Sequence, residues 1–243
     1  MKKLFVVTFW ICAVVLCQGS AHAQGPSGDT TAVNVPPRWS LSQLPDQAEL
    51  GNVFARIQSG HVDLYDALER IGERGDKAIA GLGAFLRDFR KAPDSLRQHR
   101  VFAVMALGHV GSPAAFPFLS SAARQREDQL LRGTALNILA VNHYERVVRN
   151  DLIPDKSVVH ELVQAVDDST YVQELSVPIN EIARMGLMNW LGRDFGTPDT
   201  GTVVLQTGGA PRTVTIRQFR ELWWQRVNPK IRWNHQLARF EIP

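Results

Sequence analysis

The sequence predicts an all-α fold, a short α-solenoid of helix pairs that ends in a small C-terminal cap of a β-hairpin and a helix. First, apolar residues recur at three- and four-residue spacing between Asp, Ser, Gly and Pro residues, which is typical of short capped helices. Second, part of this pattern at Ala67–Gly72 returns 39 residues later at Ala106–Gly111. The 243 residues are 44% hydrophobic and 21% charged, so the chain can bury a substantial core.

Residues 1–23 have the pattern of a secretory signal peptide. Lys2 and Lys3 precede an apolar run over residues 4–16, and residues 21–23 (Ala-His-Ala) supply the small side chains that a signal peptidase requires. We expect a mature chain that starts at Gln24 and is periplasmic or secreted in a bacterium. An uncleaved anchor is the alternative, but the apolar run is shorter than the roughly 20 residues that span a bilayer.

The cysteines and the charge balance argue against thiol chemistry, Cys-bound metal and general binding to nucleic acid. Cys12 and Cys17 are the only cysteines and both lie in the expected signal, so we expect no disulfide, thiol nucleophile or Cys-bound metal in the mature chain. Lipidation at Cys17 stays open as a less favoured alternative, since Leu16 stands where a lipoprotein signal has a small residue. The mature chain holds 25 Lys and Arg against 24 Asp and Glu, which gives no general attraction to nucleic acid. We expect no cofactor, no metal and no transmembrane segment after the signal.

Residues 24–44 are expected to be a flexible linker, because they hold Gly, Ser, Thr, three prolines and one aromatic residue, Trp39. Helical repeats are expected over residues 45–196. Asp46 with Glu49 forms a capping-box pattern at the first helix, and Asp63, Asp76 and either Asp94 or Ser95 are the expected caps of the next three. The apolar positions expected in the core include Leu50, Val53, Phe54, Ile57, Leu64, Leu68, Ile71, Ile79, Leu82, Leu86, Phe89, Val101, Val104, Met105, Leu107, Leu130, Leu131, Ile138, Leu139, Val158, Val159, Leu162 and Val166.

Gly111, Ser112 and Pro113 are expected to end one helix and begin the next. Together with Arg100, Ala103, residues 106–110, Ala114, Ala115, Phe118 and Leu119, they resemble the first helix, turn and second helix of HEAT-like helical repeats, in the form found in phycobilin-lyase-type repeats. Residues 135–139 and 183–187 match more weakly. The resemblance implies stacked helix pairs in which Ala and Gly allow close backbone approach. Membership of the phycobilin lyases would imply chromophore attachment, which the expected export argues against.

Residues 197–243 are expected to form the cap. The β-branched runs 202–206 and 212–216 flank the turn residues 207–211, which predicts a hairpin, and a helix follows that ends at Pro229. Leu191-Gly192, Phe195-Gly196 and Trp223-Trp224 are similar to the turn and the tryptophan-containing helix that often end HEAT-like bacterial proteins.

The sequence contains no Gly-x-Ser-x-Gly, P-loop or His-Glu-x-x-His motif. His143 with Glu145 and His160 with Glu161 are metal-ligand types, but such close positions on a helix point to different faces. We therefore expect surface or interface histidines. Asp167 and Asp168 are expected to serve in a turn or cap.

The basic C-terminal region is the candidate binding site. From Arg212 to Pro243 the chain holds seven Arg and Lys against two Glu, interleaved with aromatic residues that could stack on sugar rings or bind acidic partners. The candidate binding residues are Arg220, Trp223, Trp224, Arg232 and Trp233. A structural role is the alternative: Trp223 would fill the end of the core, and the arginines would pair with acids of earlier repeats.

The first functional hypothesis is an exported, non-enzymatic scaffold or adaptor that binds another exported or envelope protein, because stacked helix pairs offer an extended surface. The alternative is a module that binds a cell-envelope glycan or acidic polymer through the basic aromatic C-terminus. A third hypothesis is an enzyme with a groove site where His143 and Glu161 would meet.

Overall fold

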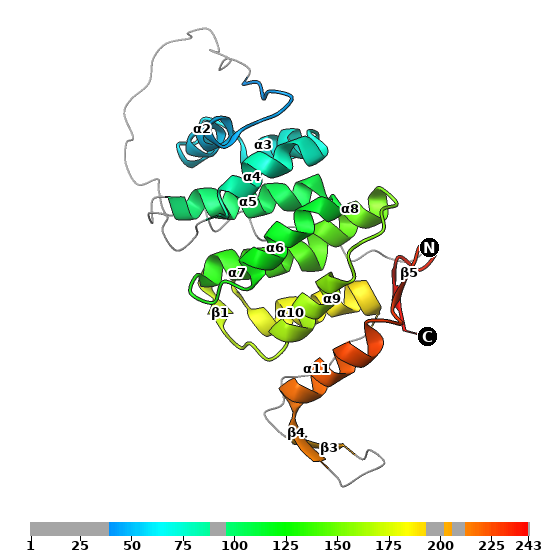
Figure 1. Ribbon diagram of the computed structural model, residues 1–243. Helices are drawn as coiled ribbons and strands as arrows, with labels where there is room; N and C mark the ends of the chain where they lie inside the picture. Colours follow the sequence, from blue (N-terminus) through cyan, green and yellow to red (C-terminus); the bar gives the residue numbers. More distant parts are fainter. Residues whose placement is uncertain (1–38, 88–95, 193–201, 206–211, 243) are drawn as a thin grey trace, which may run out of the picture.

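The computed structural model describes residues 39–87, 96–192, 202–205 and 212–242. The predicted signal peptide, both cysteines, most of the predicted linker, the expected caps Asp94 and Ser95, and the hairpin turn 207–211 lie outside these residues. The described part is mostly helical, with three small two-stranded antiparallel sheets (Figure 1). None of its helices is long and apolar enough to cross a membrane.

The α-helices are α2 (Gln47–Gln58), α3 (Leu64–Gly72), α4 (Ile79–Ala84), α5 (Arg97–Val110), α6 (Phe116–Ala123), α7 (Gln129–Asn137), α8 (His143–Arg149), α9 (Ser157–Ala165), α10 (Ile179–Leu191) and α11 (Ile216–Val227). Short 3-10 helices lie at η1 (Gly75–Ala78), η4 (Pro113–Ala115) and η6 (Gln173–Leu175), and a π-helix lies at η5 (Ile138–Asn142). The strands pair as β1 (Tyr171–Val172) with β2 (Val177–Pro178), β3 (Thr202–Leu205) with β4 (Arg212–Thr215), and β5 (Arg232–Asn234) with β6 (Arg239–Glu241).

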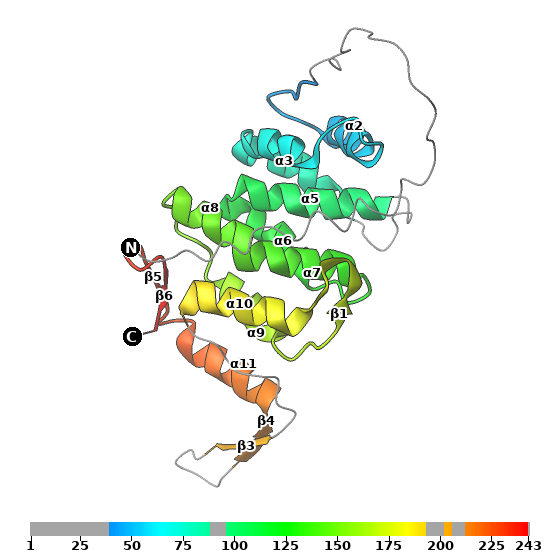
Figure 2. The same cartoon turned by 180° about the vertical axis from the view of Figure 1, so that it is seen from behind.

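The helices pack in two rows. In the first row α3 contacts α5, α5 contacts α7, and α7 contacts α10, and these helices follow one another down the molecule in both views (Figures 1 and 2). In the second row α2 contacts α4, α6 contacts α9, and α9 contacts α11. The pairs α4–α5, α6–α7 and α9–α10 join the rows. One continuous hydrophobic core runs between them, from Leu41 to Phe240.

Small residues set the close approach of helices in the first row. A Cβ on Gly108 of α5 would collide with the side chain of Ile138, and a Cβ on Gly186 of α10 would lie 2.8 Å from the Cβ of Ala140. Gly108 is one of the residues that carry the resemblance to HEAT-like repeats. Any larger side chain at either position must push two helices apart.

Most of the predicted helix ends are confirmed. Asp46 accepts a hydrogen bond from the backbone of Glu49, and Asp63 caps α3 in the same way. Ser112 caps the 3-10 turn that starts at Pro113, and Gly111 ends α5 with a left-handed φ of 67°, a conformation that favours glycine.

The prediction that Asp76 caps a helix is wrong. A 3-10 helix begins at Gly75, whose φ of 55° is also left-handed, and no side chain caps it. The expected capping box at Asp46 is half formed, because the Glu49 carboxylate accepts instead from the backbone and hydroxyl of Ser42. This contact fixes the chain in front of α2.

Trp39, Leu41 and Ser42 of the predicted linker contact the helical part of the chain. The Trp39 indole donates a 3.0 Å hydrogen bond to Asp66 of α3, and the Arg70 guanidinium lies 4.8 Å from its ring centroid. Leu41 is 7% exposed, and its carbonyl accepts from Arg74 at 2.9 Å. Trp39 is thus held against the Asp66–Arg70 ion pair of α3.

The region from Gln129 to Arg149 forms one continuous helical run in which the π-helix η5 joins α7 to α8. A π-turn shifts the hydrogen-bond pattern and leaves carbonyls in need of other donors. Side chains of α10 supply them: Trp190 donates to the carbonyl of Leu139 at 2.8 Å, and Asn189 donates to that of Ala140 at 2.9 Å.

The C-terminal region confirms the predicted hairpin and adds an unpredicted one. Strands β3 and β4 pair from Thr202 with Thr215 to Leu205 with Arg212. The second hairpin, β5–β6, packs on the end of α10, where Trp233 and Phe240 contact Trp190. It therefore closes the core beside α8 and α10.

Candidate binding groove

A cavity of about 600 Å³ opens across the first row of helices. Its walls come from α3, α5, the run α7–η5–α8, β2 and α10, so residues distant in the sequence meet there. The apolar lining is provided by Leu68, Met105, Ile138, Val141, Ile182 and Met185. A mostly apolar hollow with a few polar groups is the usual form of a ligand site. We call it the groove.

The π-helix forms part of the groove wall. Ile138, Val141 and Asn142 belong to η5 and line the groove, while its carbonyls on Leu139 and Ala140 are held by α10 as described above. Isolated π-turns are frequent at functional sites, because they re-aim side chains that a regular helix would place elsewhere.

One end of the groove is basic, and we call it the arginine end: His109, Arg146 and Arg149. Arg146 donates a 3.2 Å hydrogen bond to Nδ1 of His109, which leaves the ring proton on Nε2. Burial, followed by the positive charges of Arg146 and Arg149, lowers the pKa of His109 from 6.5 to about 4. His109 is therefore neutral near pH 7.

Within the described residues, neither Arg146 nor Arg149 has a carboxylate within 4 Å. Glu145 also lines the groove, and it forms no ion pair with any other described residue. Glu181, in the first turn of α10, is the groove's other acidic residue. The two arginines are thus available to an anionic group.

Thr134 is a buried polar residue of the groove wall. It is 3% exposed, and its hydroxyl has no hydrogen-bond partner among the described residues. A buried hydroxyl without a partner costs free energy, and a bound ligand with a polar group would remove that cost.

The C-terminal candidate residues lie in two places, and two of them are buried. On α11, Arg220 is 5% exposed and pairs with Asp167, and Trp224 is 6% exposed and stacks on His160 with ring centroids 5.3 Å apart. Trp223, expected to fill the end of the core, is half-buried and packs against the core, while Trp224 is the buried tryptophan of α11. These contacts dock α11 on α9.

The other two candidates lie on β5. Arg232 is exposed and donates to the carbonyls of Pro229 and Ile231, both at 2.8 Å. Trp233 is half-buried, with its ring edge-on to Phe240 at 5.2 Å. The five residues therefore do not form one common aromatic and basic surface.

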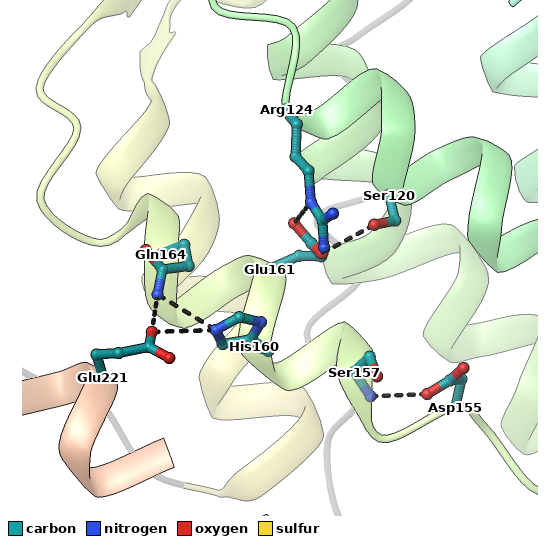
Figure 3. Close-up of polar contacts among 8 residues, drawn as sticks. All are labelled: Ser120, Arg124, Asp155, Ser157, His160, Glu161, Gln164 and Glu221. Atoms are coloured by element: carbon teal, nitrogen blue, oxygen red, sulfur yellow. Dashed lines mark hydrogen bonds and ion pairs between the residues drawn. The ribbon is translucent and has the colours of Figure 1, made fainter. Parts of the chain in front are cut away.

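His160 and Glu161 are neighbours on α9, and their side chains point to different helices. Figure 3 shows Glu161 turned toward Ser120 of α6 and Arg124 just after it, with which it bonds, while His160 turns toward Glu221 of α11 at 3.2 Å. His160 is thus an interface histidine, as expected. In the described part of the chain, no three His, Cys, Asp or Glu residues lie close enough to hold a metal ion.

Of the two expected positions, surface or interface, His143 takes the second, between α8 and α10. Its side chain is fully buried next to Trp190, and burial lowers its pKa to about 4 against the opposing influence of Asp155. Neither its ring nor Glu161 lines the groove, so the proposed meeting of these two side chains in a groove does not occur.

Asp168 performs the predicted turn role. Its carboxylate accepts from the backbone of Thr170 at 3.0 Å, and it also pairs with Arg132. Asp167 pairs with Arg220, as expected if C-terminal arginines meet acids of earlier helices.

The groove residues were not among the candidates from sequence, because each helix contributes only two or three of them. The available signal was the basic pair Arg146 and Arg149, three residues apart on one helix face. No family model, curated protein or solved structure matches this chain.

Proposed function

We propose that this chain is an exported, non-enzymatic adaptor, a short α-solenoid of HEAT-like helix pairs that binds a segment of another exported or envelope protein in the groove. Export is supported by the signal pattern of residues 1–23. The solenoid is supported by the order of helix contacts, in which successive pairs lie against one another in two rows.

The observation that carries the binding role is the groove itself. From Thr134 to Arg149 it follows a helical run of 16 residues, which spans about 22 Å at a rise of 1.5 Å per residue. An extended peptide of about six or seven residues has that length. Apolar walls with polar groups spaced along them suit a peptide segment with mixed side chains.

The glycan-binding alternative has less support. Arg220 and Trp224 are buried in the α9–α11 contact, so only Trp223, Arg232 and Trp233 retain exposed surface. Stacking on sugar rings needs open aromatic faces, and the face-to-face contact of Trp224 is already taken by His160.

Site-specific photo-cross-linking in cells tests the proposal. A photoreactive phenylalanine analogue replaces Met105 or Met185 in the groove, or Ser121, an exposed residue of α6 in the second row, as the matched control. We expect both groove positions to cross-link to the same envelope protein and Ser121 to give no such product. Equal cross-linking from Ser121, or no product from either groove position, would contradict the groove as the binding face.

A further inference from the structure

The arginine end of the groove has the properties of an anion site. Arg146 and Arg149 lie three residues apart on one face of α8, and no carboxylate of the described residues lies within 4 Å of either. Arginine binds carboxylates strongly because its planar group offers several parallel donors.

Arg146 is held in place from two sides. Its guanidinium donates to His109, and its Cβ and Cγ pack so closely on Gly111 that the glycine has no room for a side chain. Since the Nδ1 atom of His109 accepts from Arg146, its Nε2 hydrogen is a further donor at this end of the groove. A positioned cation beside a neutral donor favours an anionic ligand over a cationic one.

The rest of the groove defines the remainder of the ligand. Met105, Val141, Ile182 and Met185 provide an apolar wall that requires apolar side chains opposite to it. The unpartnered hydroxyl of Thr134 lies in the same wall and needs a polar group such as a peptide amide. A ligand that satisfies both requirements combines apolar side chains with backbone polarity.

We infer that the groove binds a peptide segment with apolar side chains whose carboxylate is held by Arg146 and Arg149. This inference rests on the proposed function and adds the chemistry that selects the partner. The carboxylate belongs either to an Asp or Glu side chain or to the C-terminus of the partner, since both present the same two oxygens to the guanidinium groups.

An array of synthetic octapeptides tests the inference. The peptides alternate Leu, Phe, Ala and Ser and differ at the last position (Glu or Gln) and at the terminus (free acid or amide). The best binders are then titrated by calorimetry against the mature protein. We expect peptides with a carboxylate to bind at least tenfold more tightly than the Gln amide, and the Glu amide and the Gln acid identify which carboxylate is preferred.

Four variants show which residues cause the difference in affinity. Arg146→Gln with Arg149→Gln should lower the affinity for carboxylate peptides about tenfold and leave the Gln amide unchanged. Arg217→Gln with Arg226→Gln, two exposed residues of α11, removes the same charge elsewhere and should change neither. Met185→Glu places an acid in the apolar wall and should weaken every peptide. Arg149→Gln alone, at an exposed position, provides a milder variant if the double variant does not fold.

The outcomes separate the two proposals. Equal binding of acid and amide peptides, lost in Met185→Glu, would overturn the carboxylate site and leave the peptide groove standing. Absence of any peptide binding, or binding that Met185→Glu does not weaken, would overturn both. Displacement of the peptides by free decanoate at lower concentration than by the peptides themselves would assign the groove to fatty acids and overturn the inference.

Discussion

Replacement of Trp190 by Ala should lower the free energy of unfolding by about 4 kcal/mol, the usual cost of removing a large buried aromatic side chain. Trp190 has no exposed surface. Its ring contacts His143, Tyr144, Trp233 and Phe240, so α8, α10 and the β5–β6 hairpin all meet on it. Its indole also donates to Leu139 in the π-helix. Removing it would leave a cavity and an unpaired carbonyl together.

Two further variants separate the loss of the hydrogen bond from the loss of ring packing and provide a control. Trp190→Phe keeps most of the packing but removes the donor to Leu139, and should cost about 1–2 kcal/mol more than the loss of ring size alone. Met188→Ala, at a residue of the same helix that is 48% exposed, should stay within about 0.5 kcal/mol of wild type. Urea unfolding followed by circular dichroism measures all three. A Trp190→Ala protein within about 1 kcal/mol of wild type would contradict the central position of Trp190.

Acid should destabilise the protein through His143. Its pKa is lowered to about 4 in the folded chain, against 6.5 when solvated, because the ring is fully buried. Below pH 6.5 the unfolded chain therefore binds a proton that the folded chain does not bind. The free energy of unfolding falls until the pH reaches about 4. From pH 7.5 to pH 5 this one residue accounts for a loss of about 2 kcal/mol. His109, whose pKa is also lowered to about 4, acts in the same direction.

The His143→Leu variant isolates this contribution. The substitution removes two ring nitrogens that have no hydrogen-bond partner among the described residues, so stability at pH 7.5 should be kept or slightly raised. The loss of stability between pH 7.5 and pH 5 should then be about 2 kcal/mol smaller than in wild type. His61→Gln, at an exposed histidine, is the control and should keep the wild-type slope. Identical slopes for wild type and His143→Leu would exclude His143 as the source.

Local chemistry explains which helix ends could be predicted. Asp46, Asp63 and Ser112 cap helices because their short side chains reach a backbone N–H two or three residues on, an interaction that depends only on neighbouring residues. Asp76 has the same side chain, but the 3-10 helix begins one residue earlier, at Gly75. Asp76 therefore lies inside the helix and not at its cap position. The linker prediction included Trp39 because its partners, Asp66 and Arg70, lie on a later helix and no local pattern shows that contact.

The π-helix and the groove depend on contacts that no local pattern records. Residues 130–140 are all buried, so their apolar character has no period that could mark the change from α to π geometry. The donors that stabilise the π-turn come from α10, some 50 residues later. On α11, Arg220 and Trp224 were expected to bind a ligand, but they lie four residues apart on the helix face that packs on α9, where their partners are Asp167 and His160.

Hydrogen exchange measured with and without the partner recovered by cross-linking tests the claim that the first row of helices is the binding face. We expect binding to slow amide exchange in residues 101–110, 138–149 and 179–185, the segments that contribute side chains to the groove, and to leave α6 and α11 unchanged. Slower exchange confined to residues 216–241, with no change along α5, α8 and α10, would contradict the groove and favour the C-terminal region.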